Sequence, residues 1–236
     1  AGNPTTQCLA SSTDGRTYTK FAGNPIVQQI SSGNRDPKVF WHEPTRRWVM
    51  ALYVGVNGKH TIQFLTSPNL KEWMLASQID GFYECPDLFE LPLDGDAARK
   101  KWVLAAANSE YRVGSFDGST FTPETPKLPG HHGRGFYAAQ TFSDLPSQDG
   151  RRIQIGWFQT ETKGMPFNQS MSLPLELNLL STADGPRLTW TPARELASLR
   201  TKTHALGPRL LQPGSANPLA GIRGAPDRHV RLAAAG

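Results

Sequence analysis

Pro37-Lys38-Val39-Phe40-Trp41 and Pro86-Asp87-Leu88-Phe89-Glu90 open two stretches of sequence that follow the same plan. In each stretch a basic pair and a tryptophan then lead into an aliphatic run, at residues 46–52 and 100–106. Two further strand-like runs follow, at residues 61–67 and 71–73 in the first stretch and at residues 110–116 and 119–121 in the second. The two prolines lie 49 residues apart. A repeat of about 50 residues with four strand-like runs is typical of a β-propeller blade.

The same pattern extends in both directions from these two units. A third unit begins at residues 137–142 and continues through residues 151–157. Towards the start, residues 9–18 match the last two strands of a unit, with Asp14-Gly15 as the hairpin turn. The sequence therefore predicts an all-β fold, an incomplete propeller of about four blades whose first blade is largely missing and whose chain begins partway through a blade.

The last part of the chain differs in composition. Residues 171–177 and 187–190 still predict strands, but after residue 200 the periodicity ends and prolines recur. We therefore expect residues 1–200 to form the propeller domain, and residues 201–236 to be a poorly structured linker or the start of a second domain. Such a segment should be trimmed first in limited proteolysis.

The net charge of +5 does not favour a nucleic-acid partner. Residues 187–236 carry +6 and the remainder carries −1, so the excess lies in the tail rather than on a folded basic face. No apolar run is long enough for a membrane helix, and no signal-peptide pattern is visible in the sequence. The sequence thus predicts no nucleic-acid and no membrane partner, and it leaves the oligomeric state open.

The cysteines and histidines do not suggest a metal centre. Cys8 and Cys85 are the only cysteines, which favours two reduced, buried thiols over a disulfide framework. A site at His131 and His132 is disfavoured because adjacent strand residues face opposite ways. We expect neither a metal nor a cofactor.

Two acidic residues stand out by their place in the repeat. Asp36 precedes Pro37, and Glu84 lies two residues before Pro86, so both stand at the head of a blade. Equivalent positions of successive blades surround one central channel, which should bring the carboxyl groups within about 10 Å, as cleavage of a glycosidic bond requires. On spacing alone, the alternative is that both residues are turn or strand-start caps.

Residues 35–41 (Arg-Asp-Pro-Lys-Val-Phe-Trp) resemble the Arg-Asp-Pro motif of glycoside hydrolase family 32, which includes invertases, levanases and inulinases. Residues 84–89 (Glu-Cys-Pro-Asp-Leu-Phe) resemble the Glu-Cys motif of that family, and residues 136–141, 156–157 and 173–177 follow in family order. The resemblance covers roughly residues 7–200. It implies a five-bladed β-propeller, here incomplete, after which a C-terminal β-sandwich could begin.

The resemblance also implies roles for particular residues. Glu84 would be the general acid/base, and Asp36 would grip the fructose hydroxyls and stabilise the transition state. The nucleophile would be an aspartate expected upstream of residue 1, so the 236-residue chain alone should be inactive. Substrate binding would fall to Arg35, Trp157, Tyr137 and Gln140, and Cys85 would tune the acid.

The resemblance leaves several functions open. The leading hypothesis is a retaining hydrolase that releases fructose from levan, inulin or sucrose, with the full-length protein secreted or periplasmic. A fructosyltransferase of the same fold, which would use the same carboxylates, is a second hypothesis. A non-catalytic fructan-binding propeller is a third hypothesis. A related arabinan-cleaving propeller family fits these motifs less well.

Overall fold

The computed structural model describes residues 4–131, 133–146, 148–201, 207, 210, 212 and 214–216. The chain divides into two compact units, Ala1–Ala193 and Arg194–Gly236. The described part of the second unit holds a short 3-10 helix, η2 (Arg194–Leu199). Most of the segment predicted to be a linker, from residue 201 on, lies outside the described residues.

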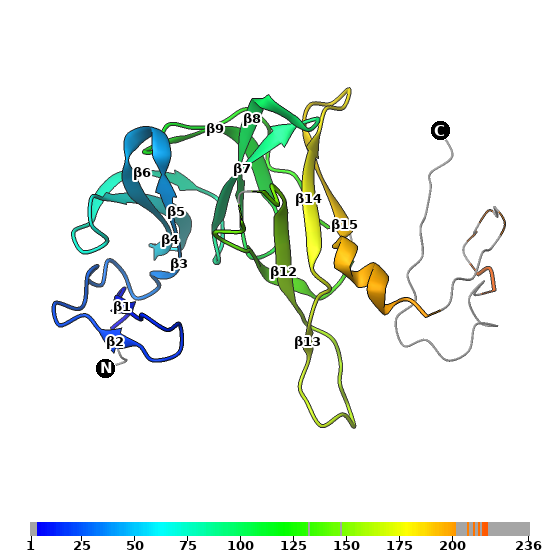
Figure 1. Ribbon diagram of the computed structural model, residues 1–236, viewed down its shortest axis with the longest axis horizontal. Helices are drawn as coiled ribbons and strands as arrows, with labels where there is room; N and C mark the ends of the chain where they lie inside the picture. Colours follow the sequence, from blue (N-terminus) through cyan, green and yellow to red (C-terminus); the bar gives the residue numbers. More distant parts are fainter. Residues whose placement is uncertain are drawn as a thin grey trace. The chain divides into compact units, whose positions relative to one another are not determined.

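The first unit begins with a two-stranded antiparallel sheet, which is followed by a four-stranded one (Figure 1). In the small sheet Ala10 pairs with Lys20 and Ser11 with Thr19. The four-stranded sheet has the simple order β3-β4-β5-β6, as expected for one propeller blade. The strands are β1 (Ala10–Ser11), β2 (Thr19–Lys20), β3 (Arg35–His42), β4 (Arg47–Val56), β5 (Lys59–Ser67) and β6 (Met74–Asp80), with the 3-10 helix η1 (Glu43–Thr45) after β3.

The remaining strands of the first compact unit form two further blades within one sheet. Strands β7 to β10 repeat the order of the first blade, and β11, β12, β14 and β15 make the next unit. A single parallel pairing, Leu93 with Leu179, joins these two units into a nine-stranded sheet. The strands are β7 (Asp87–Leu93), β8 (Asp96–Ala105), β9 (Tyr111–Phe116), β10 (Phe121–Pro123), β11 (Phe136–Thr141), β12 (Arg152–Phe158), β13 (Ser170–Met171), β14 (Leu175–Leu180) and β15 (Arg187–Pro192).

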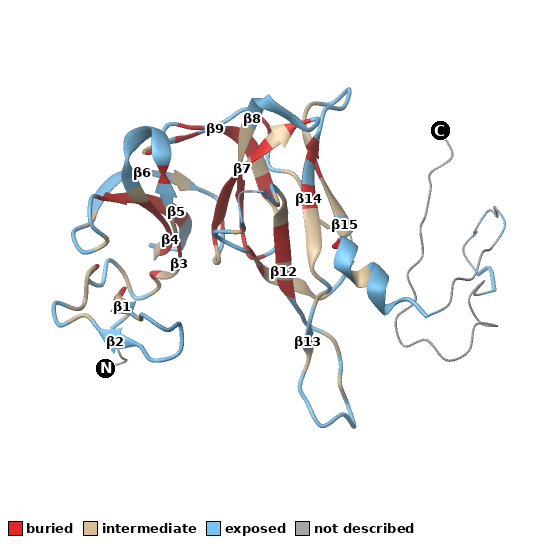
Figure 2. Cartoon of the chain, viewed as in Figure 1, coloured by how far each residue is buried: buried red, intermediate tan, exposed pale blue. Residues whose placement is uncertain are grey.

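The blades are stacked face to face. Alternate residues of a strand point to opposite sides of the sheet, so one blade can pack against a neighbour on each face. From β7 and β8, Leu88 and Leu104 join a buried cluster with Phe64 of β5, whereas Phe89 and Val103 join a second cluster with residues of β14. Both faces of this blade are therefore covered. Figure 2 shows the burial along β7 and β12, in contrast to the exposed segment that carries β13.

These observations confirm the predicted all-β architecture, and they correct three local predictions. The outermost strand of the first complete blade begins at Met74, not at residues 71–73. The turn after β1 is wider than a two-residue hairpin, because the Asp14 carboxylate accepts hydrogen bonds from the backbone of Arg16 and Thr17, both at 2.8 Å. Cys8 is a free thiol, but it is exposed rather than buried as predicted, because its neighbour Gln7 takes the buried side of this extended segment before β1.

Among the described residues, helix is confined to η1 and η2. Neither segment has the length and apolar character that crossing a bilayer would require.

Candidate active site

The candidate site lies where three inner strands begin. Asp36 in β3, Glu84 and Cys85 just before β7, and Ala138 in β11 all have positive φ angles, of 60°, 53°, 41° and 50°. Two of these places are also β-bulges, because the register shifts between Arg35 and Lys38 and between Tyr137 and Gln140. Non-glycine residues seldom adopt this conformation, and such strain gathers at functional sites.

Arg35 brings the two carboxylates together. Its Nε donates to Glu84 Oε1 at 3.0 Å and lies 3.8 Å from Asp36 Oδ2, and its Nη2 also donates to Glu84 Oε1. Its remaining nitrogen, Nη1, is fixed by the carbonyl of Gly33 at 2.9 Å. Asp36 and Glu84 thus share one cation, well inside the separation of about 10 Å that a common site allows.

The second oxygen of Glu84 is held from β11. The Tyr137 hydroxyl donates to Glu84 Oε2 at 2.5 Å. Burial opposes ionisation of Glu84, but the hydrogen bonds from Tyr137 and Arg35 outweigh it, so the pKa of this carboxyl is lowered overall. Burial and the bond to Glu84 raise the pKa of Tyr137. Glu84 is therefore a carboxylate in this arrangement, and a further negative charge beside it would raise its pKa.

Asp36 is tied to the backbone turn that carries the acid. Its Oδ2 accepts a hydrogen bond from the backbone N–H of Cys85 at 3.2 Å and another from the thiol at 3.5 Å. Burial, followed by the charge of Asp36, raises the pKa of Cys85 to about 12, so the thiol stays protonated and remains a donor. The Gln140 amide braces the same turn through the carbonyls of Cys85 and Pro86, at 3.2 and 3.3 Å.

Three aromatic residues at this site were not predicted from the sequence. The guanidinium of Arg35 lies over the Tyr53 ring, 4.7 Å from its centroid, and the Tyr53 hydroxyl meets His60 Nδ1 at 2.7 Å. The ring of Tyr83 lies 5.4 Å from that of Tyr53, and its hydroxyl also helps to lower the pKa of Glu84. Tyr83 directly precedes Glu84 in the chain, and this adjacency could have pointed to it from the sequence. Tyr53 and His60 adjoin no motif residue, so only the fold shows that they belong to the site.

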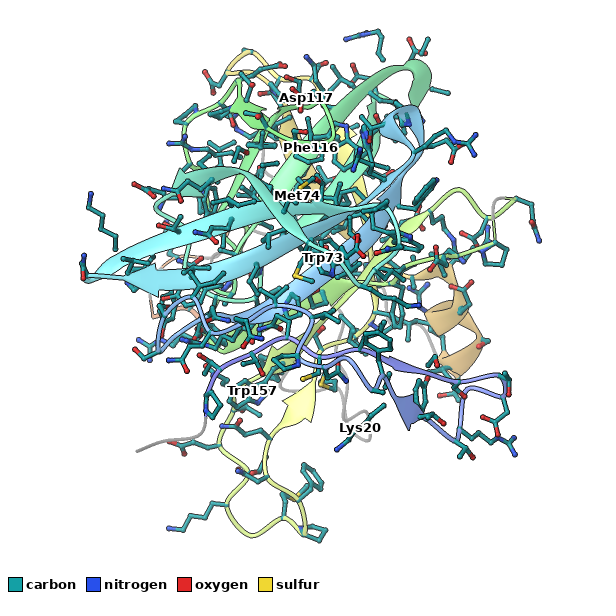
Figure 3. The ribbon with its side chains drawn as sticks, turned by 90° about the vertical axis from the view of Figure 1, so that its left-hand side faces the viewer. Lys20, Trp73, Met74, Phe116, Asp117 and Trp157 are labelled. Carbon is teal, nitrogen blue, oxygen red and sulfur yellow. The ribbon has the colours of Figure 1, made fainter. Side chains whose placement is uncertain are left out.

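Trp157 is less closely bound to this cluster than the other predicted residues. Its ring makes an edge contact with Tyr137 at 6.3 Å, and 41% of the residue is exposed. It lies beside β13, where it pairs with Met171 (Figure 3). A hollow of about 740 Å³ begins two residues further on, but it is lined by residues 159–163 and 167–169 and not by the two carboxylates.

The histidine pair predicted not to bind metal is only partly described. His131 makes an edge contact with the Phe136 ring at 5.4 Å, and His132 lies outside the described residues. Within the described ranges, no three His, Cys, Asp or Glu side chains form a group that could hold a metal ion.

The model of the glycosyl hydrolases family 32 N-terminal domain matches residues 2–192. The chain belongs to this family. It is 39% identical to a levanase of Bacillus subtilis over 92% of its length and 36% of that protein. It is 32% identical to an extracellular exo-inulinase of Aspergillus niger, over 80% of the chain and 42% of that protein. The chain thus spans about two fifths of the length of these curated relatives.

Solved structures of the family agree with the fold. A fructofuranosidase of Schwanniomyces occidentalis in complex with fructosylnystose superposes with a TM-score of 0.67 and 32% identity, covering 78% of this chain and 40% of that one. An exo-inulinase of Aspergillus awamori gives a TM-score of 0.70 and 29% identity, covering 82% and 44%. The predicted incomplete five-bladed propeller is therefore confirmed.

Proposed function

We propose that the full-length protein is a retaining β-fructosidase that releases fructose from levan, inulin or sucrose. The observation that carries the proposal is the pair of carboxylates, Asp36 and Glu84, held by the single guanidinium of Arg35. The names of the relatives, levanase and exo-inulinase, support a fructan substrate. The extracellular exo-inulinases among them also support secretion.

Glu84 is proposed as the general acid/base. It would protonate the oxygen of the leaving sugar and then activate water. Its lowered pKa suits the second of these steps, in which a carboxylate accepts a proton. The first step requires the protonated form, and a nucleophilic carboxylate nearby would supply the negative charge that raises the pKa of Glu84. The family resemblance implies that this nucleophile is an aspartate upstream of Ala1.

Asp36 is proposed as the transition-state stabiliser. The backbone N–H and thiol of Cys85 orient its carboxylate, and the 31% exposure of its side chain leaves it room to accept hydrogen bonds from fructose hydroxyls. Cys85, with its high pKa, remains a neutral donor that adds no charge beside the acid. Arg35, Tyr137, Gln140 and Trp157 are proposed to contact the sugar.

The test is to incubate the full-length protein with sucrose, levan and inulin and to follow the first product by ¹H NMR. We expect fructose released with retained anomeric configuration, and negligible release by the 236-residue chain alone, which would lack the proposed nucleophile. An inverted first product would refute the retaining mechanism. Oligosaccharides larger than the substrate would support the transferase alternative, and binding of fructan without turnover would support the binding-protein alternative.

A further inference from the structure

A buried ion pair outside the substrate-contacting residues links the three strands that carry the site. Lys38 Nζ lies 3.2 Å from Asp87 Oδ1, and only 9% and 1% of the two side chains are exposed. Thr141 completes the group, because its carbonyl accepts from Lys38 at 2.7 Å and its backbone N–H donates to Asp87 Oδ2 at 2.6 Å. Lys38 belongs to β3, Asp87 to β7 and Thr141 to β11.

Stability alone is a weak reason for such a group. Burying two charges costs desolvation free energy, and a well-packed apolar pair is often as stable or more so. The desolvation is visible at Asp87, whose full burial raises its pKa against the opposing effect of Lys38. An apolar pair would lack geometric specificity. Charge-assisted hydrogen bonds have preferred distances and angles, so they can fix where one strand begins relative to the next.

The place of each member along the chain supplies that reason. Lys38 stands two residues after the strained Asp36, Asp87 stands two residues after the strained Cys85, and Thr141 follows Gln140, which braces the Cys85 turn. Strained backbone persists only where its surroundings over-determine it. The buried group of Lys38, Asp87 and Thr141 therefore holds all three strained segments. In each segment the anchoring residue follows shortly after the residue that faces the site.

We propose that Lys38, Asp87 and Thr141 form a clamp that positions Asp36, Glu84 and Tyr137. The three clamp residues are thus positioning residues of the proposed fructosidase. This inference rests on the proposed function. If the start of β7 shifts, the bonds from Arg35 and Tyr137 to Glu84 are both disturbed, because the acceptor precedes β7 while the donors lie on β3 and β11; a shift of β3 or β11 disturbs one of them. A misplacement of about 1 Å can lower a rate by about 100-fold.

The experiment compares three variants of the full-length protein in kcat, KM and melting temperature. Asp87→Asn leaves Lys38 buried without its carboxylate, so both melting temperature and kcat should fall, kcat by about 100-fold. Lys38→Met with Asp87→Leu removes both charges, so the melting temperature should recover while kcat stays at least about tenfold low. Val113→Ala is the control, since it destabilises the same blade from the fully buried core without touching the clamp. Its kcat should match the wild type.

Recovery of kcat together with melting temperature in the double variant would overturn the proposal, because the group would then be merely structural. If Asp87→Asn fails to fold, Lys38→Arg serves in its place. It keeps the charge but cannot reproduce the ammonium geometry, so kcat should fall while the protein stays folded, and an unchanged kcat would count against the clamp.

A measurement that needs no turnover separates this proposal from the proposed function. The pKa of Glu84, read by ¹³C-carboxyl NMR, should rise in Asp87→Asn as its donors withdraw, and should stay unchanged in Val113→Ala. An unmoved Glu84 pKa in Asp87→Asn overturns the clamp. Absence of fructose release by the wild-type protein, with the Glu84 shift present, overturns only the proposed function.

Discussion

Replacing Arg35 by methionine should raise the pKa of Glu84. The guanidinium donates two hydrogen bonds to Glu84 Oε1, through Nε at 3.0 Å and through Nη2. Methionine keeps an apolar contact with the Tyr53 ring beneath but offers no donor and no charge. Burial, which favours the neutral acid, would then act against the remaining hydrogen bonds from Tyr137 and Tyr83.

The size of the effect follows from the contacts that are lost. A hydrogen bond to a charged group contributes about 1.5–3 kcal/mol. The Arg35 side chain is 37% exposed, so solvent screens the pair, and we count the two donors together as one such bond. Since one pKa unit corresponds to about 1.4 kcal/mol, the pKa of Glu84 should rise by about 1–2 units.

The assay is a ¹³C-carboxyl NMR titration of the full-length protein, with the Glu84 resonance assigned by its loss in Glu84→Gln. Glu110 is the internal control, because hydrogen bonding from Asn108 and pairing with Lys127 lower its pKa and Arg35 touches neither partner. A Glu84 pKa that is unchanged or lower in Arg35→Met would refute the assignment of Arg35 as the group that holds Glu84 ionised.

The same change should alter how stability depends on pH. The folded-state pKa of Glu84 lies below its unfolded value of 4.5, so its contribution is present above that pH and is lost as the pH falls through the folded-state pKa. Raising the folded-state pKa removes this contribution. Urea unfolding at pH 7 should therefore show Arg35→Met less stable by about 1–3 kcal/mol, and at pH 3 the difference from wild type should shrink.

Two further predictions concern the thiols and the core. At pH 8 iodoacetamide should alkylate the exposed Cys8 long before Cys85, whose pKa of about 12 keeps the thiolate scarce; equal rates by mass spectrometry would contradict the burial and charge assigned to Cys85. Leu104→Ala removes a side chain with no exposed surface from the interface between two blades, and chemical denaturation should show a loss of about 2–5 kcal/mol; a loss below about 1 kcal/mol would mean that the blades do not pack there as described.

Much of the fold could be predicted because propeller blades repeat in sequence as well as in space. The runs after Pro37 and Pro86 became β3 and β7, and each following aliphatic run became the second strand of its blade. The errors fell where the repeat gives no guidance. Met74 and Leu75 of β6 are more than half exposed, so no apolar alternation marks where that outer strand begins.

The site could be predicted as far as it is written in linear motifs. Asp36, Glu84, Cys85 and their neighbours occur in short runs, and the blade repeat together with the family resemblance predicted that the two carboxylates share one site. Tyr53 and Lys38 could not be found in this way, because their importance depends on partners from other strands. The Arg35 guanidinium lies over the Tyr53 ring, and the Asp87 carboxylate pairs with Lys38. Such pairings are set by how strands are placed side by side, which one sequence does not specify.

The assignment of Glu84 as acid/base is tested most directly by comparing Glu84→Gln with Glu110→Gln in the full-length protein. Glutamine can still accept from Arg35 at Oε1, so the first change removes the proton donor while keeping the main contact. We predict that kcat for fructose release from sucrose and levan falls about 10²–10⁴-fold in Glu84→Gln, with partial recovery on a substrate whose leaving group needs no protonation. Glu110→Gln should remain close to wild type. Near wild-type fructose release by Glu84→Gln would contradict the account.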